Sequence, residues 1–361
     1  MNIDFANLQF QYQRYKHEID GAIQSVLDRS NYIMGEEVNQ LEEALQAFTG
    51  VNHAITCGSG TDALLLALMA LDIQAGDEII TTPFTFIATA ECISLVGAKP
   101  VFVDIDEKTY NIDPLKIEEK ITHKTKAILP VSLYGQPSNM NAIQSIAQKN
   151  SLKVILDGAQ SFGSTYGSKM DSCLGDIAIT SFFPAKPLGC FGDGGACFTN
   201  NEDLAIKMKQ LRIHGQEKRY HHKYIGLGAR LDTIQAAVLN VKLKYYKEDL
   251  VLRQKVACKY TQLLGEKELV LPYLDPDSTS AWAQYSIRVK NREGVQETLK
   301  KSGVPTAVHY PIPLHIQECF KYLNHKKEDF PIAQRVSSEI LSLPMNPYVK
   351  DEEIEYISKV L

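Results

Sequence analysis

The chain has 361 residues, a length that suggests about two domains and allows a large apolar core. Its 38 basic and 43 acidic residues give a net charge of −5, which argues against nucleic acid or an anionic membrane as a partner. No segment resembles a signal peptide or approaches the roughly 20 apolar residues of a membrane span, so we expect a soluble, cytoplasmic protein. Seven cysteines without a C-x-x-C pair predict free thiols and no zinc site.

The first part of the chain predicts a candidate anion site. Apolar residues recur at helical spacing over residues 18–27 and 38–48, and Gly50 ends the second helix. A short strand over residues 54–57 then leads through the turn at 58–61 into a helix over 62–71. Free backbone N–H groups and the positive end of the helix dipole meet at such a turn.

The same turn also matches the dinucleotide fingerprint Gly-x-Gly-x-x-Ala, but only loosely. A dinucleotide fold needs an acidic residue at the end of the next strand, whereas Asp77 and Glu78 come before it. A phosphate is therefore favoured over a dinucleotide. A glycine turn without a ligand remains the alternative at this point.

Strands and helices alternate over the middle of the chain. We predict strands over residues 79–82, 101–104, 127–131, 154–157, 177–182 and 195–199, and helices over 87–96, 114–121, 140–149 and 201–213. Strands that are apolar on both faces indicate an α/β fold with a mostly parallel sheet flanked by helices. Ligands of such sheets bind beyond the carboxyl ends of the strands. We therefore expect the turn at 58–61, Asp157, Gln160, Ser181 and Lys186 to meet in one crevice.

The last part of the chain lacks this alternation. Residues 214–224 are polar, basic and aromatic, and a long helix over 233–264 follows. A strand over 283–289, a helix over 295–301 and a closing helix over 352–360 indicate a smaller α+β domain. We predict a large domain over residues 1–250, the N-terminal helices included, and a small C-terminal domain over 251–361.

Lys186 lies between Pro184 and Pro187, which places it on a stiff loop because proline lacks an N–H and restricts the preceding residue. The flanking strands are apolar. Burial disfavours the charged form of an amine and lowers its pKa, so Lys186 is a candidate nucleophile or imine former. An ordinary surface lysine is the alternative, and the other residues of the site decide between the two.

Pyridoxal phosphate needs a lysine for its imine, a carboxylate at its ring nitrogen, an anion site for its phosphate and a flat group against its ring. Lys186, Asp157, the turn at 58–61 with Ser181, and Phe84 or Phe86 provide these groups. Asp157 ends an apolar strand, where a buried charge needs a positive partner. If it stood alone, capping of a following turn would explain it equally well.

Four motifs resemble a known family: GSGTDA at 58–63, FTFIATA at 84–90, DGAQS at 157–161 and SFFPAKPLG at 181–189. Together they closely resemble the DegT-type nucleotide-sugar aminotransferases, which are pyridoxal phosphate enzymes of fold type I, and the similarity covers essentially the whole chain. The resemblance implies Lys186 as the imine lysine and proton shuttle, and Asp157 as the partner of the ring nitrogen. It also implies cofactor contacts at Gln160 beside the ring, Phe86 stacked on it, and Gly60, Thr61 and Ser181 at the phosphate. Deoxysugar dehydratases of the same family carry histidine in place of the lysine.

The resemblance further implies a homodimer with shared active sites, to which residues 219–222 and 228–232 of the neighbour contribute. Relatives commonly have an asparagine that reaches the partner's phosphate where this chain has Gly228, so another group fills that role or the phosphate is held less firmly. Without the family, residues 219–222 are read as a solvated basic face. His221 and His222 are poor metal ligands without further partners, and no metal is expected.

The most similar relatives aminate carbon 3 of UDP-2-acetamido-3-keto sugars, including a keto-uronic acid, on the way to surface polysaccharides such as lipopolysaccharide. The resemblance implies a ping-pong aminotransferase that takes its amine from glutamate. Substrate contacts are implied at Tyr220, Arg230, His309, Tyr310 and His315, although His309 suits a structural role equally well. The alternatives are a dTDP-linked 3-keto- or 4-keto-6-deoxyhexose as substrate, a dinucleotide-dependent sugar oxidoreductase, and a non-catalytic regulator that binds the cofactor.

Overall fold

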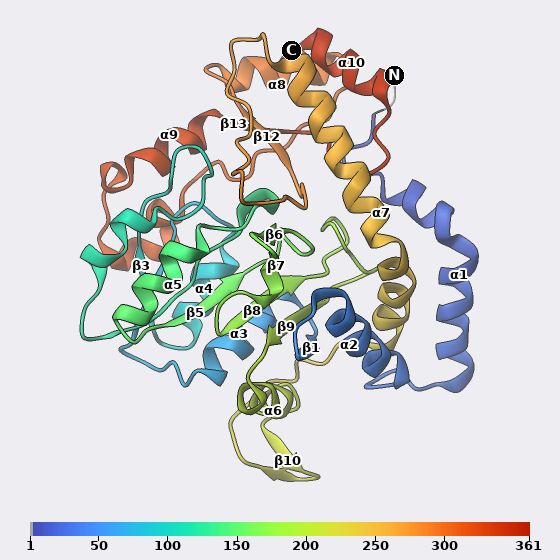
Figure 1. Cartoon of the computed structure of the whole chain (residues 1–361), viewed down its shortest axis with the longest axis vertical. Helices are drawn as coiled ribbons and strands as arrows, with labels where there is room; N and C mark the ends of the chain where they lie inside the picture. Colours follow the sequence, from blue (N-terminus) through green and yellow to red (C-terminus); the bar gives the residue numbers. More distant parts are fainter. Residues whose placement is uncertain (1–2) are drawn as a thin grey trace.

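The computed structural model describes residues 3–361, and at its centre is a seven-stranded sheet (Figure 1). The strands are β1 (His53–Cys57), β2 (Glu78–Thr81), β3 (Lys99–Phe102), β4 (Thr125–Ile128), β5 (Lys153–Asp157), β8 (Ile177–Ser181) and β9 (Gly195–Thr199). Their order across the sheet is β1-β9-β8-β5-β4-β2-β3. β9 is antiparallel to both neighbours, and β8, β5, β4, β2 and β3 are parallel. The predicted α/β class with a mostly parallel sheet is confirmed.

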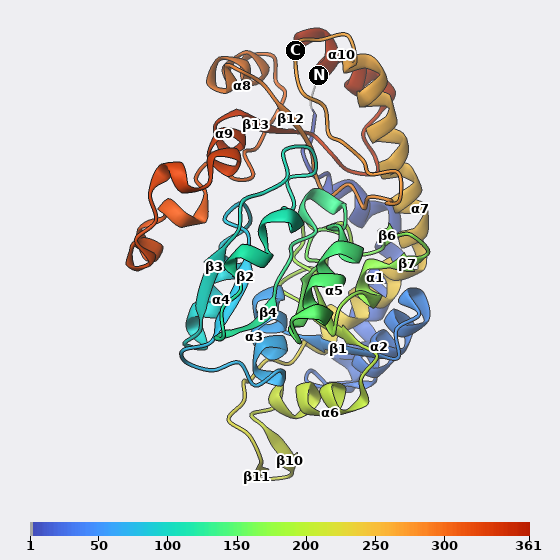
Figure 2. The same cartoon turned by 60° about the vertical axis from the view of Figure 1, so that its left-hand side comes forward.

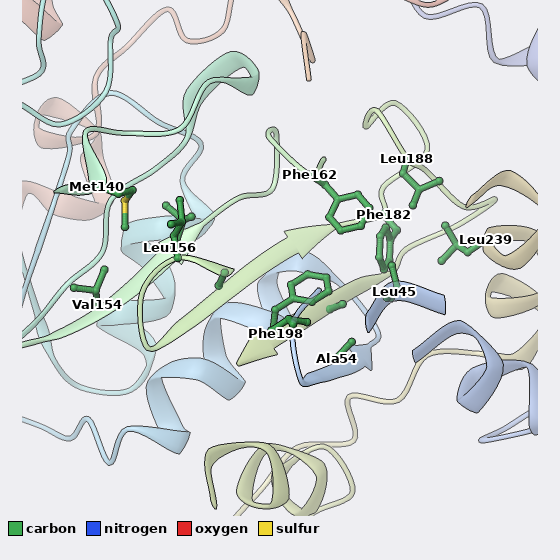
Figure 3. Close-up of a cluster of buried hydrophobic side chains, with 14 of the residues drawn as sticks. Leu45, Ala54, Met140, Val154, Leu156, Phe162, Phe182, Leu188, Phe198 and Leu239 are labelled. Atoms are coloured by element: carbon green, nitrogen blue, oxygen red, sulfur yellow. The ribbon is translucent and has the colours of Figure 1, made fainter. Parts of the chain in front are cut away.

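Helices cover both faces of this sheet because successive side chains of each strand point to opposite faces. Leu156 of β5 packs with α2 (Glu36–Thr49), α5 (Met140–Lys149) and the first part of α7 (Thr233–Leu264). Its neighbour Ile155 packs with α3 (Gly60–Ala70), α4 (Ala88–Leu95) and α6 (Glu202–Leu211). Figure 3 shows part of the first of these two clusters, with Leu156, Val154 and Phe198 among the labelled side chains.

The C-terminal part forms a separate apolar cluster. It contains β12 (Tyr285–Arg288), β13 (Ile340–Leu343), α8 (Arg292–Lys301) and α10 (Asp351–Val360), and α9 (Pro331–Glu339) packs nearby. The predicted long helix is confirmed: α7 has 32 residues and carries side chains of both the sheet cluster and the C-terminal cluster (Figure 2). α1 (Leu8–Arg29) lies along α7 (Figure 1), with Tyr15 stacked on Tyr245 at 4.3 Å between ring centroids. The division into domains near residue 250 stays a prediction.

Some local predictions are wrong. Residues 114–121 form two 3-10 turns, η1 (Pro114–Lys116) and η2 (Glu118–Lys120), because Asp113 caps the first turn and Ile121 is already extended. Residues 214–224, for which no element was predicted, contain the projecting hairpin of β10 (Gln216–Lys218) and β11 (His221–His222). α9, β13 and the short hairpin of β6 (Thr165–Tyr166) and β7 (Lys169–Met170) were also not predicted. Within residues 3–361, no helix has the length and apolar character to cross a membrane.

Candidate active site

A cavity of about 480 Å³ lies beyond the carboxyl ends of β1, β2, β4, β5 and β8. The predicted residues that line it are Gly60, Thr61, Phe86, Asp157, Gln160, Ser181, Lys186, His309 and Tyr310. The expected crevice is therefore confirmed. We call the side formed by residues 59–61, Asp157, Ser181 and Lys186 the floor, and the side formed by Gln284, His309 and Tyr310 the far wall.

Asp157 ends β5 and is almost completely buried. Thr89 donates its hydroxyl to Oδ2 at 2.8 Å, and the Ala159 N–H donates to Oδ1 at 3.2 Å. Burial raises the pKa of the carboxyl, and these two hydrogen bonds together with the charge of Lys186 lower it. The pKa is raised on balance, because burial is the largest of these influences. Both hydrogen-bond donors are neutral, so a cationic group placed in the cavity would be the charged partner that favours the ionised carboxyl.

The loop that carries Lys186 is fixed at both ends by the core. Phe182 and Leu188 belong to the apolar cluster of Figure 3, and the Cys190 N–H donates to the Phe182 carbonyl at 2.8 Å. The loop closes tightly at Gly189, where a Cβ would lie 2.5 Å from the Pro184 carbonyl oxygen. Such a loop holds the Lys186 amine in one place.

The electrostatic environment of Lys186 favours its neutral form. Burial lowers the pKa of its amine below the ordinary value, and the charge of Asp157 opposes part of that shift. An amine that loses its proton more easily than an exposed lysine is a better nucleophile and a better base near neutral pH.

The turn before α3 forms a cup for an anion. Ser59 accepts the Asp62 N–H at 3.0 Å on its hydroxyl and the Ala63 N–H at 3.0 Å on its carbonyl, and so caps the helix. Gly60 and Thr61, whose N–H groups precede these bonds, line the cavity. Two glycines permit the close packing beneath the cup. A Cβ on Gly60 would lie 2.8 Å from Cβ of Ser181, and a Cβ on Gly195 would lie 2.4 Å from the Ser59 carbonyl oxygen.

Hydrogen bonds hold the far wall to residues that follow β4 and β5. Gln160 accepts the Tyr134 N–H at 2.7 Å and donates its amide to the Tyr310 hydroxyl at 3.2 Å. Phe86 is 53% exposed, with its ring centroid 6.0 Å from that of Tyr310. A flat group can lie against this free face of the Phe86 ring.

His309 is fixed by Ser342, whose hydroxyl is 2.9 Å from Nδ1, and its carbonyl accepts the Tyr134 hydroxyl. Burial, helped by the charge of Lys186, lowers the pKa of His309 to about 4. The imidazole is therefore neutral at physiological pH. These contacts give His309 a structural partner while its ring still lines the cavity.

Three of the predicted substrate contacts do not line the cavity of a single chain. Tyr220 is 78% exposed at the tip of the β10–β11 hairpin, and Arg230 is half-buried behind the Gly58 turn. His315 is 1% exposed, with its ring centroid 4.8 Å from that of Phe330 and Nε2 3.4 Å from the Lys327 carbonyl. Within one chain, this packing leaves the His315 ring no contact with a ligand in the cavity, so the prediction of a direct substrate contact is not supported.

The ring of His214 occupies the space beside Gly228. A Cβ on Gly228 would lie 3.0 Å from the His214 ring, so the imidazole stands where a side chain at 228 would begin. The relatives' asparagine would thus compete with this ring for space.

Thr89 and Gln284 of the cavity lining were not predicted from the sequence. Thr89, which donates to Asp157, lies in the FTFIATA motif but was given no role; its spacing of four from Thr85, at the start of the predicted helix, could have indicated that the two hydroxyls meet. Gln284 precedes β12 and lines the far wall, and no pattern in the sequence indicates it.

The charged, hydrogen-bonding and aromatic groups of the cavity match those that pyridoxal phosphate needs. A buried carboxylate with neutral donors suits a protonated ring nitrogen, the cup at the start of α3 suits a phosphate, and the exposed Phe86 ring suits an aromatic ring. Lys186 provides the amine. Among the described residues of the lining, its amine is the one basic group besides the neutral His309, whereas Asp157 and Asp193 are acidic.

Comparisons with known proteins agree with this chemistry. A model of the DegT/DnrJ/EryC1/StrS aminotransferase family matches residues 13–361. The chain is 48% identical to the UDP-2-acetamido-2-deoxy-3-oxo-D-glucuronate aminotransferase of Pseudomonas aeruginosa, over 99% of each chain. It is 42% identical to the dTDP-3-amino-3,6-dideoxy-alpha-D-galactopyranose transaminase of Aneurinibacillus thermoaerophilus, over 98% of this chain and 97% of that one. A crystal structure of NtdA from Bacillus subtilis with the bound cofactor PMP matches with a TM-score of 0.93 at 32% identity, over 99% of this chain and 84% of that chain.

Proposed function

This chain belongs to the DegT/DnrJ/EryC1/StrS family of pyridoxal phosphate-dependent aminotransferases, and we propose that it moves the amine of glutamate to carbon 3 of a UDP-linked 2-acetamido-3-keto sugar. The observation that carries the proposal is the placement of Lys186 and Asp157 in one cavity with an anion cup between β1 and α3. The keto sugar is glucose- or glucuronate-derived, and its aminated product serves surface polysaccharide synthesis such as that of lipopolysaccharide.

When bound, pyridoxal phosphate supplies an electron-withdrawing ring that stabilises negative charge on the carbon that loses its proton. Asp157 would keep the ring nitrogen protonated, and Thr89 and the Ala159 N–H hold its carboxylate in place. Gly60, Thr61 and Ser181 would bind the phosphate, Phe86 would stack on the ring, and Gln160 would contact its edge.

Lys186 would anchor the cofactor and move the proton in both half-reactions. Its lowered pKa makes the free amine available as a base, and the closed loop from Phe182 to Cys190 keeps Nζ at one position. Lys186 would handle the proton when glutamate gives up its amine and, in the reverse order, when the keto carbon of the sugar receives it.

A homodimer is part of the proposal because the cavity has few cations for its ligands. A cofactor phosphate and a nucleotide diphosphate bring several negative charges, whereas Lys186 and the neutral His309 are the basic groups of the described lining. The projecting β10–β11 hairpin and its edges carry Lys218, Arg219 and Lys223. The partner's hairpin would supply these charges, with Tyr220, and Arg230 would act near the same interface.

The shared site can be tested by complementation. Lys186→Ala and Arg219→Ala variants would each be inactive in the sugar half-reaction as homodimers. Mixed and re-associated, they form hybrid dimers with one intact site, and we expect up to a quarter of wild-type activity per total active site. Absence of any recovered activity in hybrids that form by native mass spectrometry would refute the shared site.

Substrate choice is tested with a panel of nucleotide keto sugars: UDP-linked with and without a C6 carboxylate, and dTDP-linked 3-keto and 4-keto 6-deoxyhexoses. We expect turnover with the UDP-linked 3-keto sugars and identification of the C3 amine in the product. The similarity to a dTDP-sugar transaminase makes the dTDP series the second candidate. Preference for that series would overturn the UDP assignment alone.

Glutamate itself separates an enzyme from a regulator that only binds the cofactor. The loaded protein should change from the pyridoxal to the pyridoxamine spectrum and release 2-oxoglutarate. A stable pyridoxal spectrum with glutamate would favour the regulator. The seven free cysteines, two of them exposed, accord with the cytoplasmic location that we also propose.

A further inference from the structure

Thr85 and Thr89 place two buried hydroxyl groups in line with Asp157. The Thr89 hydroxyl donates to Oδ2 of Asp157 at 2.8 Å, and the Thr85 hydroxyl lies 3.2 Å from that of Thr89. Both threonines are almost completely buried and line the cavity. Thr85 lies in the irregular segment between β2 and α4, and Thr89 lies in the first turn of α4. The Asp157 carboxyl is therefore the end of a short chain of hydroxyl groups.

The direction of this chain follows from the number of protons in it. Each hydroxyl has one proton to donate, and an ionised carboxylate can only accept. When Asp157 is ionised, the Thr89 proton is directed at Oδ2, so the Thr89 oxygen accepts the proton of Thr85. Within residues 3–361, the Thr85 hydroxyl has no hydrogen-bond partner besides Thr89. Both hydroxyl protons then point toward the carboxylate.

A chain with this direction favours the ionised form of the carboxyl. A hydroxyl that accepts one hydrogen bond becomes a stronger donor in the next, so Thr85 strengthens the bond from Thr89 to Oδ2. Hydrogen bonds donated to a carboxylate favour its charged form, whereas burial raises the pKa of Asp157. Thr85 thus offsets part of the cost of burying the charge, although it does not touch the carboxylate.

We propose that Thr85 is a positioning residue that acts through Thr89 to keep Asp157 ionised and aligned for the ring nitrogen of the cofactor. This inference rests on the proposed function, in which Asp157 is the partner of that nitrogen. Loss of the Thr85 hydroxyl should weaken retention of the cofactor and slow both half-reactions by the same factor.

A purely structural role of Thr85 is the competing explanation. The hydroxyl pair also ties the segment after β2 to the start of α4, and Phe86 lies between the two threonines in the sequence. Loss of that tie would displace the Phe86 ring and weaken every contact with the cofactor, whether or not the contact involves the ring nitrogen.

The two explanations are separated by an analogue of pyridoxal phosphate in which a C–H group replaces the ring nitrogen. The analogue keeps the aldehyde and the phosphate but offers no N–H to the Asp157 carboxylate. Wild type and Thr85→Val are loaded with either compound, and loss of the bound chromophore during dialysis is followed by absorbance. We expect Thr85→Val to lose pyridoxal phosphate about 2- to 10-fold faster than wild type and to lose the analogue at the wild-type rate.

Two further variants are the matched controls. Thr85→Ser keeps the hydroxyl and should restore the wild-type rate of cofactor loss. Thr81→Val removes a buried threonine hydroxyl that donates to the Leu129 carbonyl at 2.8 Å, outside the cavity. This control should not distinguish the two compounds. A selective loss of pyridoxal phosphate from Thr81→Val would show that the effect does not come from the hydroxyl chain.

A double-mutant cycle tests whether Thr85 acts through Thr89. Thr89→Val removes the link between Thr85 and the carboxylate, so adding Thr85→Val to it should not speed the loss of pyridoxal phosphate any further. Additive effects of the two substitutions would show that Thr85 acts by another route, and the inference would be wrong.

The outcomes also separate this inference from the proposed function. If Asp157→Asn retains pyridoxal phosphate as well as wild type does, Asp157 is not the partner of the ring nitrogen, and the inference falls with that assignment. If Asp157→Asn loses the cofactor faster but Thr85→Val loses both compounds alike or neither, the role of Thr85 alone is overturned. Should Thr85→Val fail to fold, Thr85→Ala removes the same hydroxyl without adding a methyl group and should show the same selective loss.

Discussion

The floor and the far wall of the cavity are built in different ways. Each floor residue ends or follows a buried strand of the central sheet, as Asp157 ends β5 and Ser181 ends β8. The far-wall residues lie on irregular chain beside the small sheet of β12 and β13. Gln160 follows β5 and donates to Tyr310 of the far wall, and Tyr134 follows β4 and donates to the His309 carbonyl.

This difference separates the chemistry from the choice of substrate. Strand ends in a packed parallel sheet hold side chains rigidly, which suits groups that must stay aligned with a cofactor. Irregular segments on a rigid scaffold can change without disturbing the sheet, which suits recognition of different sugars. We therefore expect floor substitutions to impair both half-reactions, whereas substitutions confined to the far wall impair chiefly the sugar half-reaction.

The most severe test of the floor is Lys186→Ala. Without the amine, the cofactor has no covalent anchor and the proton has no carrier, so we expect no turnover in either half-reaction. The absorbance of the cofactor–lysine imine should also disappear. Calorimetry with UDP-N-acetylglucosamine should still detect binding, because the far wall is intact. Retention of the absorbance or of turnover would refute the assignment.

Asp157→Asn keeps the shape of the floor and removes its charge. An amide can still accept from Thr89, but it cannot hold a ring nitrogen in its protonated form, so both half-reactions should slow by about 10²–10³-fold. Stopped-flow spectra with glutamate and with the aminated sugar measure the two rates. Thr89→Val, which removes one hydrogen bond to the carboxylate, is the milder comparison. A loss confined to one half-reaction would break the contrast between floor and far wall.

The floor could be predicted from the sequence because each of its residues lies next to a short sequence pattern that predicts a loop, a turn or the end of a strand. Pro184 and Pro187 place Lys186 on a loop, and an apolar run ends at Asp157. Parallel strands then bring their carboxyl ends to one edge, so the meeting of these residues follows from the fold class. The prediction failed where short 3-10 turns replaced a helix at 114–121, since local capping by Asp113 outweighed the apolar spacing.

The far wall could not be predicted in the same way. Gln284 belongs to no motif, and its place in the cavity depends on how the C-terminal cluster packs against the sheet. His315 lies six residues after His309 in one motif, yet its ring is enclosed by Phe330 instead of facing the cavity. Proximity in sequence does not determine on which side of an irregular segment a side chain lies.

Lys242→Met tests how the core supports the floor. Lys242 of α7 is buried, its ammonium donates to the Gly189 carbonyl at the end of the Lys186 loop, and burial lowers its pKa to about 8. Loss of that donor leaves the carbonyl unpaired, so both half-reactions should slow about 10-fold and equally. Lys244→Met, an exposed position on the same helix that pairs with Glu18, is the control and should be silent. Unchanged rates in Lys242→Met would show that the loop needs no such support.

Asp171→Asn tests a second support of the floor through pH. Asp171 accepts the hydroxyl of Ser161, just beyond Gln160, and burial raises the pKa of its carboxyl to about 7. The folded protein therefore binds this proton more tightly than the unfolded chain, and the associated stability is lost as the pH rises through about 7. Thermal unfolding from pH 5 to 9 should show a smaller decline for the variant, with a midpoint higher by a few degrees at pH 8, at roughly 2–4 °C per kcal/mol.

His309 has the opposite effect on the stability of the fold. Its pKa of about 4 in the folded protein is below the value of about 6.5 in the unfolded chain, so the unfolded chain binds the proton more tightly. Stability is therefore lost as the pH falls below about 6.5. Its contribution is common to wild type and Asp171→Asn, so it cancels in their difference. Parallel pH curves for the two proteins would contradict a protonated Asp171.

The smallest effect concerns the proposed boundary between two chains. Gly228 does not have the left-handed backbone that requires glycine, so Gly228→Asn is compatible with the fold once the exposed His214 ring moves by a few tenths of an ångström. If the partner's phosphate lies within reach, the new amide adds one hydrogen bond and slows cofactor loss during dialysis by about 2- to 10-fold. Gly228→Ala displaces the same ring without supplying a donor and should show no gain. Equal behaviour of the two variants would mean that His214, and not the missing amide, determines how firmly the floor holds its phosphate across the interface.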